Sequence, residues 1–160
     1  DDIKNKNLLD VQAAVLSYGG YNLYSPALKG IFETRKNPFW TLALSKPRGI
    51  FGNNFNAQEN PEMYKAISHI YNIPNVDERK LPPQFITSAS EDRVTPVHAI
   101  EEYVKALGDA GQDATYWEYK DQRHAYLDSG KTFLSGNDFK RDAIPALKKV
   151  MHFLNSKLLD

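Results

Sequence analysis

The sequence predicts an α/β fold in which the strands of a parallel sheet are flanked by helices, and two observations lead to this class. Two segments with strand character, 85–89 and 114–119, are separated by a helical segment, 95–107, long enough for a crossover. Such a strand, helix and strand form a right-handed parallel unit in nearly all known proteins. In addition, the apolar run 11–17 is typical of a strand buried on both faces of a parallel sheet.

Length and composition exclude several classes of protein. The 160 residues include 20 basic and 20 acidic side chains and no cysteine. A chain of this length usually forms one domain. The balanced charge favours neither a nucleic acid nor an anionic membrane surface as a partner, and the lack of cysteine excludes disulfides and thiolate catalysis. No apolar run approaches the roughly 18 residues of a membrane helix, so we expect a soluble chain, with the cytoplasm slightly favoured.

The first part of the chain holds one expected strand and one expected insertion. Residues 1–10 are polar and carry no motif, and the strand at 11–17 is stopped by Tyr18 and two glycines. Residues 21–60 are rich in aromatic side chains, Gly, Pro and Asn, without a helical or strand period. We therefore expect 21–60 to be an insertion of short helices and loops.

The second part of the chain supplies the remaining elements in order. Asn60 can cap a short helix through about Ile67, since Pro61 and Glu62 follow it. Prolines introduce the strand at 85–89. The next helix has Thr95 as its expected cap and Pro96 at its first position. The last helix, near 142–158, has Pro145 in its first turn and carries an apolar stripe: Leu147, Val150, Met151, Leu154 and Leu158.

A carboxylate and an imidazole follow the two paired strands. Asp92 comes just after the strand 85–89, and His124 comes just after the strand 114–119. Because the carboxyl ends of parallel strands carry the chemistry in such sheets, these side chains should meet at one edge. A carboxylate on one ring nitrogen orients the imidazole, whose other nitrogen can then accept a proton from a hydroxyl nucleophile. The alternative is that Asp92 is a turn former and His124 a surface residue.

The segment Leu81–Leu127 resembles the carboxyl-terminal portion of α/β-hydrolases, especially the esterase and lipase branch and the related serine oligopeptidases. In that family a double proline, a strand and a G-x-x-D-x-x-V-P segment supply the catalytic acid, and a later strand leads to the catalytic histidine. Asp92 stands at the acid position, with Val94 and Pro96 after it, and His124 stands at the base position. The order of acid before histidine also matches the family.

Two departures from the family pattern stand out. Ala125 follows the histidine where the family usually has glycine. More seriously, the nucleophile elbow G-x-S-x-G is absent, because no two glycines of the chain are four positions apart. The resemblance therefore implies that 1–160 is a single, partial α/β-hydrolase domain, the carboxyl-terminal portion of the fold. In that reading 11–17 is the strand after the nucleophile strand, and 21–60 is a lid-like insertion.

The function implied by the resemblance is that of a serine hydrolase, most simply a carboxylesterase or lipase-type enzyme acting on a small acyl or aryl ester. His124 would be the general base and Asp92 the acid that orients it. The nucleophile and the oxyanion donors would come from a preceding polypeptide. No cofactor and no metal are implied.

Two other hypotheses remain open. The sequence from Ser17 to Tyr21, S-Y-G-G-Y, resembles the elbow of serine oligopeptidases, so Ser17 could be the nucleophile of a peptidase. Val15 replaces the first glycine of that elbow, which counts against this alignment. Alternatively, the chain is a non-catalytic fragment or subunit whose exposed sheet edge pairs with an amino-terminal hydrolase segment or with a second copy.

The remaining histidines and aromatic residues give weaker signals. The other three histidines have no partner at metal-ligand spacing: His69, His98 and His152. Several aromatic residues of the expected insertion could line an acyl pocket, although packing of the insertion onto the sheet explains each of them better: Phe39, Trp40, Phe51 and Phe55.

Overall fold

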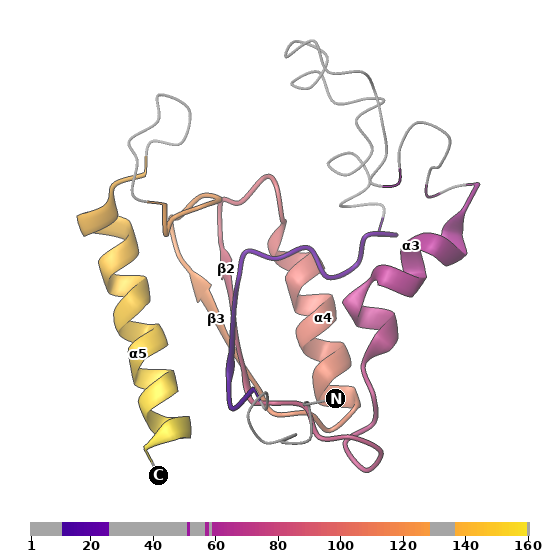
Figure 1. Cartoon of the computed structure of the whole chain (residues 1–160). Helices are drawn as coiled ribbons and strands as arrows, with labels where there is room; N and C mark the ends of the chain where they lie inside the picture. The colour runs from indigo at the N-terminus through magenta and orange to yellow at the C-terminus, as the bar shows by residue number, and fades with distance from the viewer. Residues whose placement is uncertain (1–10, 26–50, 52–56, 58, 129–136, 160) are drawn as a thin grey trace, which may run out of the picture.

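The computed structural model of the chain describes residues 11–25, 51, 57, 59–128 and 137–159. Its central element is a parallel sheet with the spatial order β1 (Ala14–Ser17), β2 (Gln84–Ala89), β3 (Ala114–Tyr119) (Figure 1). Helices lie on both sides of this sheet (Figure 1). The α/β class and the parallel arrangement of the strands are therefore confirmed.

The register of the sheet brings the carboxyl ends of the strands to one edge. Ser17 at the end of β1 lies opposite Thr87 of β2, and Thr87 lies opposite Trp117 of β3. Strand β1 begins at Ala14, later than the predicted start, and its residues are half-buried. They are not fully buried because β1 is one of the two edge strands of the described sheet.

Helix α4 (Val97–Asp109) covers one face of the sheet and encloses the main core. The alternation of side chains along a strand directs Ile86 of β2 to this face. The core on this side consists of five buried side chains: Tyr21, Ile86, Ile100, Tyr103 and Leu107. Tyr21 stacks on Tyr103 with 4.2 Å between the ring centroids, so the chain just after β1 belongs to the core. Most of the expected insertion lies outside the described residues.

Helix α5 (Ile144–Leu158) covers the opposite face (Figure 1). Phe153 stacks on Phe85 of β2, and Ala146 is buried. The apolar stripe noted in the sequence is not the face that this helix buries, because Leu147 and Met151 remain 39% and 56% exposed. Each residue of an α-helix is rotated by roughly 100° from the one before it, so Leu147 points along the sheet when Ala146 points into it.

The beginnings of the helices differ from the prediction in detail. Helix α3 (Pro61–Ile67) forms as predicted, but the side chain of Asn60 makes no capping hydrogen bond. A short 3₁₀ turn, η3 (His69–Asn72), follows it. A π-helical turn, η4 (Phe139–Ala143), precedes α5, so α5 starts two residues later than predicted. In the described part of the chain, no helix combines the length and the apolar character that crossing a membrane requires.

Thr95 is not the cap of α4, which was the sequence-based expectation. The residue at the cap position of this helix is Pro96. The hydroxyl of Thr95 instead donates to the carboxylate of Asp92, across a distance of 2.8 Å. The prediction was wrong because the helix begins at Val97, so Thr95 lies before the cap position and its hydroxyl donates to the charged carboxylate of Asp92.

Candidate active site

Backbone hydrogen bonds join the two loops that follow β2 and β3. The amide of Ser90 donates to the carbonyl oxygen of Tyr119 at 3.0 Å, and the amide of Glu91 donates to that of Gln122 at 2.8 Å. The path of the first loop is fixed further by the amide of Asp92, which donates back to Ala89 at the end of β2. The loop with the acid and the loop with the histidine are thus held side by side.

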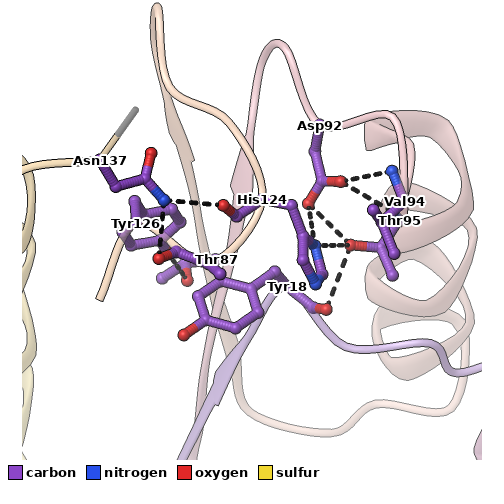
Figure 2. Close-up of polar contacts among 9 residues, drawn as sticks. Tyr18, Thr87, Asp92, Val94, Thr95, His124, Tyr126 and Asn137 are labelled. Atoms are coloured by element: carbon purple, nitrogen blue, oxygen red, sulfur yellow. Dashed lines mark hydrogen bonds and ion pairs between the residues drawn. The ribbon is translucent and has the colours of Figure 1, made fainter. Parts of the chain in front are cut away.

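The structure brings together the two residues that the sequence singled out. His124 Nδ1 lies 2.8 Å from Asp92 Oδ2 (Figure 2). The carboxylate is fully buried, whereas the imidazole is 33% exposed. Among the residues that the structure describes, none hydrogen-bonds to Nε2 of His124. This is the arrangement of a general base, in which a carboxylate fixes one ring nitrogen and the other can accept a proton.

The carboxylate of Asp92 has hydrogen-bond partners on both oxygens. The amides of Val94 and Thr95 donate to Oδ1 at 2.7 and 2.8 Å. The hydroxyl of Thr95 and Nδ1 of His124 contact Oδ2. Burial alone would raise the pKa of Asp92, but the hydrogen bonds from His124, Thr95 and Val94 outweigh it and hold the pKa below its usual value. Asp92 is therefore ionised near neutral pH, as an orienting carboxylate requires.

Tyr18, directly after β1, forms a wall beside the imidazole. Its ring meets the ring of His124 edge to face, with 5.1 Å between the centroids. The same ring makes a similar contact with Tyr126, also at 5.1 Å. Tyr18 has a positive φ of 41°, a strained conformation for a residue with a side chain, and its amide donates to Thr87. Strain of this kind persists only where surrounding contacts fix it, as these do.

The loop that carries His124 is held from the other side by Asn137. This buried amide donates to the carbonyl oxygens of His124 and Ala125, at 2.9 Å each. Ala125 has a positive φ of 62°. Since glycine adopts this conformation without steric cost, the backbone here explains the preference for glycine after the histidine in the family that the sequence resembles.

Ser17, the alternative nucleophile, lies at the end of β1, opposite Thr87 of β2. Its side chain lies close to Tyr126, whose hydroxyl bonds the hydroxyl of Thr87. Within the described ranges, Ser17 makes no hydrogen bond to His124. The sequence of Ser17–Tyr21 is here the end of a strand and the start of a core segment.

Sequence reasoning missed Thr95, Tyr18 and Asn137 as parts of the site. The spacing of an aspartate and a threonine three residues apart was a usable signal, because an aspartate accepts from backbone amides two and three residues ahead in turns. No local pattern marks Asn137, which reaches His124 through the tertiary fold. The aromatic side chains expected in an acyl pocket lie outside the described residues, except Phe51, whose ring contacts Tyr64.

The other histidines lie on separate elements. His69 is in η3, His98 in α4 and His152 in α5. In the portion of the chain that the structure describes, no three His, Asp or Glu side chains gather into a group that could hold a metal ion.

Several solved structures share this fold. The acylaminoacyl peptidase of Pyrococcus horikoshii matches with a TM-score of 0.61 and 18% identity, over 93% of this chain and 20% of that one. A puromycin-hydrolyzing peptidase of Mycobacterium tuberculosis matches with a TM-score of 0.59 and 17% identity, over 92% of this chain and 19% of that one. The carboxylesterase Cest-2923 of Lactobacillus plantarum matches with a TM-score of 0.56 and 11% identity, over 91% of this chain and 44% of that one. The chain thus spans about a fifth of the two peptidases.

The comparison with family models is more specific than the structural likeness. No curated protein matches the chain. A model of the prolyl oligopeptidase family matches residues 40–158, a range that includes Asp92, His124 and the helices around them. Since this match spans well over half of the sequence, the chain belongs to the prolyl oligopeptidase family, within the serine hydrolases of the α/β-hydrolase superfamily.

Proposed function

We propose that Asp92 and His124 are the acid and the general base of a catalytic triad that hydrolyses a carboxylic acid derivative. The observation that carries this proposal is the 2.8 Å contact between His124 Nδ1 and the fully buried, ionised Asp92. Nε2 would take the proton of a serine hydroxyl as its oxygen bonds the substrate carbonyl carbon. The imidazolium would then donate that proton to the leaving group, and water would release the acyl group by the same steps.

The nucleophile would come from a segment that precedes β1 in the enzyme. Two observations support this. The chain spans about a fifth of the peptidases that share its fold. In the described sheet, β1 pairs with β2 alone, so its other edge offers free backbone groups to a further parallel strand. A segment bound there would lie beside the carboxyl end of β1, where Tyr18 contacts His124.

Two substrate classes fit this machinery. A small ester is the substrate expected from the sequence, and a carboxylesterase is among the proteins that share the fold. A peptide or acyl-amino acid is the second candidate, favoured by the match to the prolyl oligopeptidase family. The two differ in the leaving group, because an amine must receive a proton from the imidazolium before it departs, whereas an activated aryl alcohol departs without one.

The assignment of Asp92 and His124 can be tested in the complete enzyme. Replacing His124 by Ala should lower kcat by about 10³-fold or more, because a triad without its base retains only binding and oxyanion stabilisation. The matched control is His98→Ala, which removes an exposed histidine from α4. Equal activity of the His124 and His98 variants would contradict the proposal.

The substrate class is tested separately, with a pair of substrates that share one acyl group. The complete enzyme is given an acetyl-amino acid as its p-nitrophenyl ester and as its p-nitroanilide. A value of kcat/KM for the anilide within about 10²-fold of the ester would favour the peptidase, and activity on the ester alone would favour the esterase.

A further inference from the structure

We propose that Thr95 is a positioning residue of the acid and base pair, whose hydroxyl fixes the oxygen of Asp92 that faces His124. This inference rests on the proposed function of that pair. Three contacts carry it: the Thr95 hydroxyl lies 2.8 Å from Asp92 Oδ2, 3.1 Å from the carbonyl oxygen of Tyr18 and 3.4 Å from His124 Nδ1 (Figure 2).

The two oxygens of the Asp92 carboxylate are held in different ways. Oδ1 accepts from two backbone amides, which any residue other than proline at positions 94 and 95 would supply. Oδ2 has two side-chain partners, the imidazole of His124 and the hydroxyl of Thr95. Without the hydroxyl, the imidazole would be the only hydrogen-bond partner of Oδ2 among the described residues. The hydroxyl therefore sets the orientation of the oxygen that the imidazole must meet.

The hydroxyl of Thr95 also connects the pair to β1. It has a single proton and two acceptors within reach, Asp92 Oδ2 and the carbonyl oxygen of Tyr18. The ring of Tyr18 in turn meets the ring of His124 edge to face. Thr95 thus ties the acid to Tyr18, the residue beside the base, although Thr95 and Tyr18 are separated by 77 positions in the sequence.

A purely structural role for the hydroxyl is less consistent with the geometry. Thr95 does not cap α4, and its side chain is buried against the acid and the end of β1. The titratable groups that interact with Asp92 among the described residues are His124 from the loop after β3 and, farther away, Tyr126, while Tyr18 from the end of β1 contacts the ring of His124. Because few titratable groups interact with Asp92, a change in its pKa after replacement of Thr95 can be attributed to the loss of the hydroxyl.

The experiment compares Thr95→Val, which removes the hydroxyl and keeps the shape, with Thr95→Ser, which keeps the hydroxyl. Thr115→Val is the matched control, since Thr115 is exposed on β3. The first measurement is the titration of the Asp92 carboxyl carbon by NMR, together with the shift of the His124 ring nitrogens. Thr95→Val should raise the pKa of Asp92 and move the Nδ1 resonance, whereas Thr95→Ser and Thr115→Val should leave both close to the wild type.

The second measurement is made on the complete enzyme. Thr95→Val should lower kcat by roughly tenfold with KM unchanged, and Thr95→Ser should restore kcat. An unshifted Asp92 and His124 signal in a folded Thr95→Val variant would overturn the inference. If the valine variant does not fold, Thr95→Ala takes its place in the same comparison with serine.

The two proposals fail in different ways. If His124→Ala keeps full activity while Thr95→Val shifts the NMR signals of Asp92, the proposed function fails and the positioning of the pair by Thr95 stands. If His124→Ala is inactive while Thr95→Val changes neither the signals nor kcat, the function stands and the role of Thr95 is refuted.

Discussion

The side chain of Asn137 donates a hydrogen bond of 2.9 Å to the backbone carbonyl oxygen of His124. It donates a second to the carbonyl oxygen of Ala125, so one amide holds the two consecutive peptide groups that follow His124. The contact joins the segment before η4 to the loop after β3. The position of the imidazole therefore depends on a residue that has no direct contact with the ring.

Replacing Asn137 by Ala should destabilise the chain by about 1–3 kcal/mol. The two carbonyl oxygens would lose their donors in a buried setting, which costs more than the hydrogen bonds themselves contribute. Urea denaturation measures the change in the free energy of unfolding. Asn155→Ala on the exposed side of α5 is the control and should change it by less than about 0.5 kcal/mol. Equal stabilities of the two variants would refute the role of Asn137.

Replacing Ala125 by Gly should stabilise the chain by about 0.5–1 kcal/mol. The left-handed conformation at φ 62° costs a residue with a side chain roughly 1–2 kcal/mol, and glycine avoids this cost while losing some conformational entropy. The same substitution at Ala106, inside α4, should instead destabilise by about 1 kcal/mol. Thermal unfolding shows whether each variant is more or less stable than the wild type. A loss of stability in Ala125→Gly would contradict the expectation.

The ionised state of Asp92 predicts how the stability of the chain depends on pH. Because its pKa in the folded chain lies below the unfolded value of about 3.9, the carboxylate stabilises the fold above that pH. This contribution is lost as the pH falls through the folded pKa. Asp92→Asn should therefore be less stable than the wild type at pH 6, and the difference should shrink at pH 3. A difference that is the same at both pH values would contradict this, and the comparison is made by urea denaturation.

The sequence predicted the elements that local patterns define, and it failed where tertiary contacts decide. The strands around 85–89 and 114–119 were found because β-branched and aromatic runs are local signals, and the order of elements then brought Asp92 to His124. Thr95 was misread because the pattern of a helix start does not reveal that its amide and hydroxyl both donate to the carboxylate of Asp92. The stripe on α5 shows the same limit, since periodicity locates an apolar face without saying what covers it.

The role of Ser17 is decided by a probe that reacts with activated serines. Among the described residues Ser17 makes no hydrogen bond to His124, and we expect a fluorophosphonate to leave Ser17 unmodified. In the complete enzyme, mass spectrometry should find the adduct on a serine that precedes β1, and Ser17→Ala should keep both labelling and turnover. His124→Ala should abolish labelling in the same preparation. An adduct on Ser17 would instead make this serine the nucleophile, and β1 would then be the strand that carries it.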